Sequence, residues 1–364
     1  MPSINVAPRY FTSDTRRRYN AADFENERSG GVVELEAKIV TVHPKRTFTI
    51  ARSSSDEFHQ VILEITDSGT TGRGEAAPTS YYGQNADEAL EALRNIEIKD
   101  LWDIEGTLRG NAALPPSALS ALDSALHDLA AKKLGVPVWR MLGLARPAPV
   151  TSYTLGIADR ETTLKDARRL SGFPVFKMKV GSREDIETVR TVAETVEAEL
   201  WVDANEAFSP EEAPEVVEEL KEIGVAMIEQ PVSVAEGPEA LRRAMEAAHP
   251  VPVMADESAV NAGDVPALAS CVSGVNVKLA KCGGIRRALE QVHTARALGM
   301  KVMLGCMVET SLGIVAAAQI SGFFDFVDLD GAMLLADDPY SGPEYENGRI
   351  LLPEKTPGLG VEPR

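Results

Sequence analysis

The hydrophobic pattern divides the chain into two parts. In the first part, residues 32–43 and 60–66 alternate between apolar and polar side chains, which predicts half-buried antiparallel strands. Residues 117–134 then place apolar side chains three and four positions apart, which predicts a helix that Gly135 and Pro137 terminate. We therefore expect the chain to open with a small α+β module of roughly 110 residues.

From residue 150 onward, short apolar runs alternate with amphipathic segments. Eight such runs within about 180 residues, separated by helices, predict parallel strands that close into a βα-barrel. We expect no helix after the last strand, and an extended tail that returns to the first module. The runs are 150–156, 175–180, 200–203, 225–229, 252–256, 275–279, 301–305 and 326–329, and examples of the helices are 184–197, 210–223 and 285–298.

These patterns give a division of the chain into four parts. The polar N-terminal segment lacks the apolar core of a signal peptide and is expected to be a flexible extension. The predicted parts are the extension at 1–31, an α+β capping domain at 32–146, a catalytic barrel at 147–335 and a C-terminal tail at 336–364 that packs on the capping domain.

The composition limits which binding partners and which cellular compartment are expected. The 55 acidic and 37 basic residues give a net charge of −18, which disfavours nucleic acid and anionic membranes because both require a basic face. No apolar run approaches the length of about 18 residues that a transmembrane helix needs. Three cysteines form no C-x-x-C pair, so we expect a reducing, cytoplasmic location.

Three carboxylates stand at the ends of consecutive predicted strands. Asp203, Glu229 and Asp256 are 26 and 27 residues apart, which is one strand–helix step of a parallel barrel. The carboxyl ends of barrel strands share one mouth, so these side chains are expected to meet there. An acid in this position is often only a helix cap, but three repelling charges on neighbouring strands favour a bound Mg²⁺ or Mn²⁺. A zinc site is disfavoured because histidine is absent from these strand ends.

Lysines flank the three carboxylates on either side. Lys177 and Lys179 share one face of their strand, since side chains alternate with a period of two, and the barrel mouth is where both can remain charged. Lys177 is expected to depress the pKa of Lys179 and to touch a substrate oxygen. Across the barrel we assign Lys278 as a second base and Lys281 as a structural neighbour. Two bases on opposite faces of one carbon are what racemisation requires.

Further polar residues end other strands. Asp328 and Asp330 follow the eighth strand and face one side; they are either turn acids or a clamp for a cationic group of the substrate. Asn205, two residues beyond Asp203, is expected to orient a metal ligand.

At these residues the chain resembles the enolase superfamily in its muconate-cycloisomerase-like subgroup. The resemblance spans about residues 32–360, and its motifs are 177–179 (KMK), 203–205 (DAN), 229–231 (EQP), 255–258 (ADES) and 277–284 (VKLAKCGG). It implies an α/β fold with a (β/α)7β modified TIM barrel, and a capping domain that the C-terminal tail completes. It also implies one Mg²⁺ per subunit on Asp203, Glu229 and Asp256, with Lys179 and Lys278 as the acid–base pair; a homo-oligomer is expected.

Within that subgroup, residues 305–309 (GCMVE) and 328–330 (DLD) are similar to the dipeptide epimerases. The similarity implies that a Mg²⁺-dependent isomerase inverts the α-carbon of a dipeptide's C-terminal residue by 1,1-proton transfer through an enediolate. Asp328 and Asp330 would bind the substrate's α-ammonium, and Cys306 and Met307 would line its site. Arg52 stands near the position of a carboxylate-binding arginine in glutamate-specific members. The loop that carries it, residues 44–52, is one residue shorter than in those members, which speaks against an Ala-Glu preference.

Other functions remain open on the sequence alone. The same subgroup contains N-acylamino-acid racemases, o-succinylbenzoate synthases and muconate-type cycloisomerases, whose substrates would leave Asp328 and Asp330 without a purpose. A barrel glycosidase would use two carboxylates without a metal. A non-catalytic, metabolite-binding barrel would not exchange a substrate proton with solvent.

Overall fold

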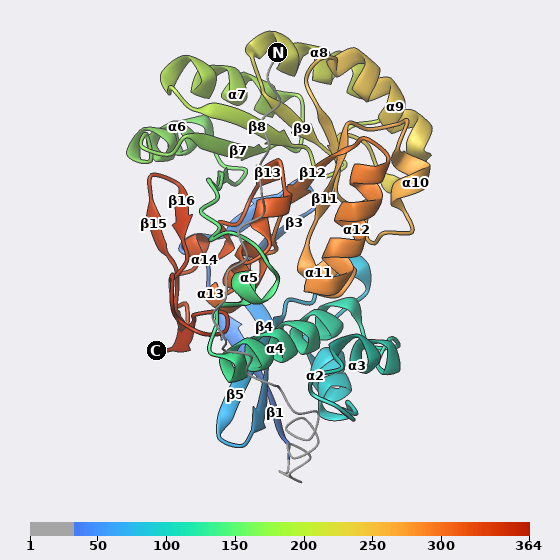
Figure 1. Cartoon of the computed structure of the whole chain (residues 1–364). Coiled ribbons are helices and arrows are strands. Elements are labelled where there is room, and N and C mark those ends of the chain that lie inside the picture. Colours follow the sequence, from blue (N-terminus) through green and yellow to red (C-terminus); the bar gives the residue numbers. More distant parts are fainter. Residues whose placement is uncertain (1–32) are drawn as a thin grey trace, which may run out of the picture.

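A computed structural model describes residues 33–364. The predicted N-terminal extension at 1–31 lies outside the described residues. An antiparallel sheet with the strand order β1-β4-β5 opens the described chain, and helix α4 packs against it (Figure 1). The sheet consists of β1 (Glu34–Val42), β4 (Phe58–Asp67) and β5 (Thr70–Ala76), with the small hairpin β2 (Phe48–Ile50) and β3 (Ser53–Ser55) inserted between its first two strands.

Four helices complete this part of the fold. The longest, α4, begins with a proline and ends at Gly135, whose φ of 68° is the left-handed conformation that glycine adopts without steric cost. Gly72 and Gly74 allow α4 to lie directly on β5, because a Cβ at either position would overlap the helix backbone. We call the elements from β1 to α5 the capping module. Its helices are α2 (Ala86–Arg94), α3 (Ile104–Gly110), α4 (Pro116–Leu134) and α5 (Val138–Met141).

Eight parallel strands form the second part of the fold. They are arranged in sequence order from β6 to β13, and Ser152 just before β6 donates its backbone N–H to Val327 of β13 at 3.1 Å, so the two edges meet. The predicted barrel is therefore confirmed. Its strands are β6 (Tyr153–Leu155), β7 (Val175–Lys179), β8 (Glu199–Asp203), β9 (Met227–Glu229), β10 (Val253–Ala255), β11 (Gly274–Val277), β12 (Lys301–Leu304) and β13 (Phe326–Val327).

Helices cover the outside of these strands (Figure 1). The expectation that no helix follows the last strand is wrong in detail, because a four-residue helix begins at Gly331. The helices are α6 (Arg160–Arg169), α7 (Glu184–Thr195), α8 (Ala213–Ile223), α9 (Gly237–Ala248), α10 (Val265–Leu268), α11 (Leu279–Cys282), α12 (Ile285–Ala297), α13 (Ser311–Ala318) and α14 (Gly331–Leu334), with short 3₁₀ turns at η2 (Val234–Glu236) and η3 (Ser321–Phe323). A third 3₁₀ turn, η1 (Ser80–Tyr82), belongs to the capping module.

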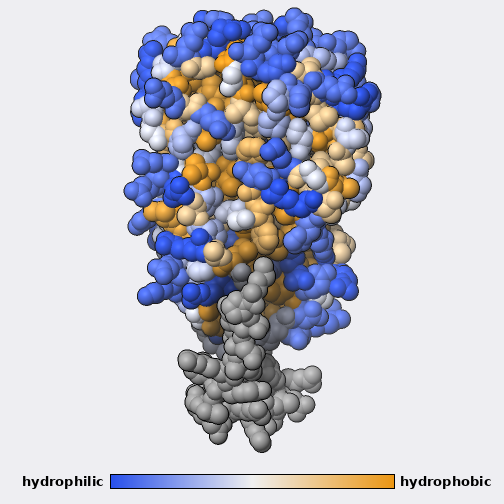
Figure 2. All heavy atoms as spheres, turned by 45° about the horizontal axis from the view of Figure 1, so that its top comes forward, coloured by the Kyte–Doolittle hydropathy of each residue, from blue (hydrophilic) through white to orange (hydrophobic). Residues whose placement is uncertain are grey.

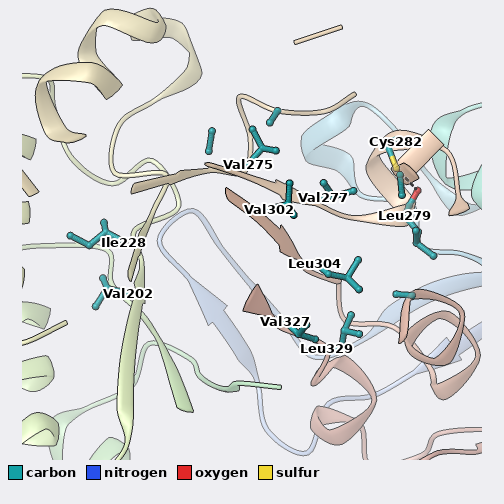
Figure 3. Close-up of a cluster of buried hydrophobic side chains, with 14 of the residues drawn as sticks. Val202, Ile228, Val275, Val277, Leu279, Cys282, Val302, Leu304, Val327 and Leu329 are labelled. Atoms are coloured by element: carbon teal, nitrogen blue, oxygen red, sulfur yellow. Dashed lines mark hydrogen bonds between the residues drawn. The ribbon is translucent and has the colours of Figure 1, made fainter. Parts of the chain in front are cut away.

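The period of two along each strand separates a core face from a site face. Val202 on β8 and Val277 on β11 point outward into the layer between strands and helices, together with other apolar side chains (Figure 3). Asp203, next along β8, belongs to the opposite face. Burial of this layer stabilises the barrel by about 25 cal/mol for each Å² of apolar surface removed from water.

The C-terminal tail runs beside the capping module. Gly358 exchanges backbone hydrogen bonds with Val136 and Val138, and Leu359 donates its N–H to Asp128 of α4. The division of the chain at 1–31, 32–146, 147–335 and 336–364 remains a prediction. The tail strands are β14 (Tyr340–Ser341), β15 (Glu344–Glu346), β16 (Arg349–Leu351) and β17 (Glu362–Pro363).

The face shown in Figure 2 is mostly hydrophilic, with apolar side chains between the polar ones. Among the described residues, no helix is long and apolar enough to cross a membrane.

Candidate active site

The strand register brings the predicted carboxylates to one mouth of the barrel. Lys179 pairs with Asp203 across β7 and β8, and Asp203 pairs with Glu229 across β8 and β9. Asp256 directly follows β10. Ligand oxygens of the three carboxylates lie within 4.8 Å of one another, and all three residues are buried.

The oxygens of these carboxylates suit a hard divalent cation. Asn205 donates its backbone N–H to Asp203 at 3.0 Å, and the Asn276 amide donates to Oε1 of Glu229 at 2.8 Å. Burial, and then the charge of Asp203, raises the pKa of Glu229 to about 7. A buried cluster of like charges is a site that a cation would stabilise.

Lys177 occupies the centre of this acidic cluster. Its buried Nζ lies 3.0 Å from Oδ2 of Asp203, 2.8 Å from Oε2 of Glu229 and 2.8 Å from Oδ2 of Asp328. Burial lowers the pKa of Lys177, but the surrounding carboxylates outweigh that effect and raise it above its usual value. Lys177 therefore remains an ammonium group that holds carboxylates, and in this structure it contacts them directly.

Lys179 and Lys278 face the same cavity from opposite walls. Nζ of Lys179 lies 2.5 Å from Oδ2 of Asp203, and Nζ of Lys278 lies 2.7 Å from Oδ2 of Asp256. Both line a cavity of about 550 Å³. Strands β7 and β11 stand four places apart in a ring of eight, so the two amines approach the cavity from opposite sides.

Lys281 does not line the cavity and is fully buried. Its Nζ donates to Oδ1 and to the backbone carbonyl of Asp256, at 2.5 and 2.7 Å, and also to the carbonyls of Asn276 at 2.8 Å and Ala259 at 3.2 Å. The lysine thus fixes Asp256 and the loop that follows it.

Asp328 and Asp330 lie at the end of β13 and line the cavity with Cys306 and Met307. Asp328 is already engaged, because it accepts from Ser152 at 2.6 Å and from Lys177. Asp330 accepts the backbone N–H of Thr154, and no described lysine or arginine forms an ion pair with it. Burial, followed by the charge of Asp328, raises the pKa of Asp330 to about 7. A cationic group in the cavity would offset this repulsion.

Arg52, at the turn of the β2–β3 hairpin, is paired with protein carboxylates. One guanidinium nitrogen lies 2.6 Å from Glu257 and the other 3.5 Å from Glu206, and the guanidinium stacks 4.1 Å from the centre of the Tyr81 ring. Tyr81 in turn donates its hydroxyl to Glu206 at 2.8 Å. The Arg52 guanidinium, which the sequence placed near a carboxylate-binding position, is therefore largely neutralised by Glu257 and Glu206.

Sequence reasoning missed Asn276, Glu206 and Glu257. Asn276 lies on β11, two positions before Lys278, so the period of two could have placed it on the cavity face. Glu206 directly follows the motif 203–205, and Glu257 directly follows Asp256. The sequence offers no signal that either would receive an arginine from a distant hairpin.

Two family models match the chain. The model described as enolase C-terminal domain-like matches residues 160–364, and the mandelate racemase / muconate lactonizing enzyme N-terminal domain matches residues 34–143. Together they cover the capping module and the barrel from helix α6 onward.

Individual relatives match over almost the whole length. An L-Ala-D/L-Glu epimerase from Bacteroides thetaiotaomicron is 37% identical over 91% of this chain and 88% of its own. A hydrophobic dipeptide epimerase from Roseobacter litoralis is 38% identical over 90% of this chain and 98% of its own. The crystal structure of a dipeptide epimerase from Methylococcus capsulatus, complexed with Mg and the dipeptide L-Arg-D-Lys, is 32% identical, with a TM-score of 0.85 over 91% of this chain and 99% of that chain.

Proposed function

The chain belongs to the mandelate racemase / muconate lactonizing enzyme family of the enolase superfamily, and from this premise we propose how its residues act on a substrate. The protein is a dipeptide epimerase. Relatives named for acting on dipeptides cover nearly its full length, and its strand ends carry the carboxylates and amines that proton transfer at a carbon centre needs. This convergence of sequence likeness and site geometry is the observation that carries the conclusion.

Mg²⁺ is the metal of this site, and Asp203, Glu229 and Asp256 hold it. When bound, the cation supplies positive charge beside the substrate carboxylate, which lowers the cost of the negative charge that develops there as the α-proton leaves. Asn205 and Asn276 keep two of the ligand carboxylates in place by donating to one oxygen of each. Lys281 does the same for Asp256.

Lys179 and Lys278 are the acid and the base. One amine removes the α-proton of the C-terminal residue from one face, and the other delivers a proton to the opposite face, which inverts the carbon. Their placement at the ends of β7 and β11, across one cavity, supports this division of work. Which amine serves which stereoisomer follows from the substrate's orientation. Proton transfer of this kind depends on a heavy-atom approach of about 2.6–3.2 Å.

Asp330, assisted by Asp328, binds the α-ammonium of the substrate's N-terminal residue. The support is that Asp330 is buried, faces the cavity and lacks a cationic partner among the described residues, whereas Asp328 already receives Lys177. Cys306 and Met307 complete this wall. An ammonium group placed here would gain a charge-assisted hydrogen bond worth about 1.5–3 kcal/mol.

The preferred side chains differ among the relatives. Their names specify Ala-Glu, hydrophobic dipeptides and an Arg-Lys ligand, so the dipeptide is shared and its side chains are not. In this chain Arg52 is occupied by Glu257 and Glu206. We propose that this cavity does not select an acidic side chain through Arg52.

Assembly and location extend the same proposal. We propose that the enzyme is a cytoplasmic homo-oligomer; its free cysteines, Cys271, Cys282 and Cys306, fit a reducing compartment. Size-exclusion chromatography with light scattering would test the assembly, and a monomer at micromolar concentration would contradict it.

Substitution of Asp330 by Asn tests the dipeptide site against the acylamino-acid alternative. We expect Asp330→Asn to lower kcat/KM for a free dipeptide by about 10- to 150-fold, because the charge-assisted contact is lost. The same dipeptide with an acetylated amino group should react poorly with both enzymes. Asp325→Asn, at the opposite end of β13, serves as the matched control. If the wild-type enzyme turned over the acetylated and free dipeptides equally well, an N-acylamino-acid racemase would be the better description.

A further inference from the structure

The backbone segment after β11 carries Lys278 and leads into helix α12. Lys278 accepts at its carbonyl from the N–H groups of Lys281 and Cys282, at 3.0 and 3.1 Å, and Leu279 accepts from Gly283 and Gly284, at 2.9 and 3.0 Å. These hydrogen bonds make a continuous turn, so a shift at the start of α12 is passed back to Lys278.

The N-terminus of α12 is capped by a residue from another part of the fold. The N-cap residue of α12 is Gly284, which has no side chain to accept the first N–H groups of the helix. Instead, Oδ2 of Asp123 on helix α4 accepts the Arg286 N–H at 3.1 Å. Asp123 is completely buried and belongs to the capping module. A carboxylate at this end of a helix satisfies an otherwise unpaired donor and matches the positive end of the helix dipole.

Helix α4 lies directly against this turn (Figure 1). A Cβ at Gly284 would lie 2.5 Å from Oδ2 of Asp123, and one at Gly283 would lie 2.9 Å from Leu119. Both glycines also have φ near 100°, a conformation that other residues adopt at a cost. The two glycines therefore allow α4 to approach the backbone next to Lys278.

Asp123 is itself held in position. Nδ1 of His127, one turn along α4, lies 2.8 Å from the Asp123 carbonyl and 3.1 Å from its Oδ1. On the far side of the turn, Lys281 fixes the same segment to Asp256 and Asn276. Hydrogen bonds therefore hold the turn on two sides: those of Lys281 tie it to the barrel, and that of Asp123 ties it to the capping module.

We propose that Asp123 is a positioning residue through which the capping module sets the place of Lys278 for proton transfer. The proposal rests on the proposed role of Lys278 as one of the two bases. Proton transfer tolerates little displacement, since a misplacement of about 1 Å can cost about a hundredfold in rate. Loss of Asp123 is expected to affect the face of the substrate that Lys278 serves, and to leave the face that Lys179 serves nearly unchanged.

Exchange of the substrate α-proton with D₂O tests this for each face separately. Each stereoisomer of a dipeptide is incubated alone with the Mg²⁺-loaded enzyme, and its initial exchange rate is measured by mass spectrometry. Lys278→Ala identifies the isomer that depends on Lys278. Asp123→Ala is then compared with Asp123→Asn, which keeps an acceptor for Arg286, and with Asp128→Ala. Asp128 is a buried carboxylate on the same helix, but its contacts are with Arg73, Lys132 and Leu359.

We expect Asp123→Ala to slow exchange of the Lys278-dependent isomer by about tenfold or more relative to the other isomer. Asp123→Asn should restore most of the rate, and Asp128→Ala should change both isomers equally. Equal losses for both isomers in Asp123→Ala, or no loss, would overturn the proposal. If Asp123→Ala does not fold, Leu119→Ala loosens the contact on Gly283 and should give the same asymmetry. If Lys278→Ala slows neither isomer, the proposed function fails instead.

Discussion

Replacing Lys281 with Met separates the structural lysine from the catalytic one. Methionine keeps most of the volume of the side chain and removes its ammonium group. Four acceptors lie within 3.2 Å of the buried Nζ and share its three N–H donors; three are backbone carbonyls and one is Oδ1 of Asp256. No water reaches this position easily, because the side chain is fully buried. These acceptors would be left without their donor.

The expected cost follows from breaking a buried ion pair on one side. Such a change lowers the free energy of unfolding by about 3–5 kcal/mol, because the remaining charge and carbonyls stay buried. Lys278→Met is the matched comparison. Its Nζ has a single protein acceptor, Asp256, and lines the cavity, so water can replace it and we expect a cost of about 1 kcal/mol or less.

Urea unfolding followed by circular dichroism, with Mg²⁺ present at equal concentration, measures the difference. Lys281→Met should show the lower midpoint, and Lys278→Met should keep nearly the wild-type midpoint while losing activity. A Lys281→Met midpoint equal to or above that of Lys278→Met would refute the assignment of the two lysines.

Two other predictions concern the interface between the capping module and the barrel. Burial, followed for Glu75 by the charge of Glu309, raises the pKa of Glu75 to about 8, and burial raises that of Glu309 to about 7. Both carboxyl groups therefore hold protons that the unfolded chain releases above about pH 4.5, so the free energy of unfolding should fall as the pH rises from about 4.5 to about 8. Glu309→Gln should make this fall shallower, as measured by urea midpoints across that pH range. An unchanged pH dependence in the variant would contradict the prediction. Arg52→Met should raise KM for all dipeptides, because it releases the hairpin from Glu257, but it should alter the ratio of kcat/KM for Glu-ending and Gln-ending dipeptides by less than about threefold. A selective loss of the Glu-ending substrate would show that Arg52 binds the substrate carboxylate.

Much of the fold followed from periodicity. Alternation identified β1 and β4, and the spacing of apolar runs identified the eight barrel strands, because both patterns reflect which side of a strand is buried. Helix α13 was less visible, since all its residues from Ser311 to Ala318 are buried and the pattern has no polar face. The hairpin β2–β3 leaves no detectable alternation in the sequence, because each of its strands has only three residues.

The site was predictable where strand ends alone decide position. Asp203, Glu229 and Asp256 could be placed together because parallel strands end at one mouth. Contacts between segments far apart in sequence could not be read in this way. Arg52 meets Glu257 across 205 residues, and Asp123 meets Arg286 across 163 residues, so neither pair leaves a local spacing.

Exchange of the α-proton in single-lysine variants tests the central claim most directly. With Mg²⁺ and D₂O, Lys179→Ala and Lys278→Ala should each abolish exchange of one stereoisomer of a dipeptide's C-terminal residue, and the two variants should affect opposite isomers. Retained exchange of both isomers in either variant, or loss of the same isomer in both, would contradict two amines acting on opposite faces of one carbon.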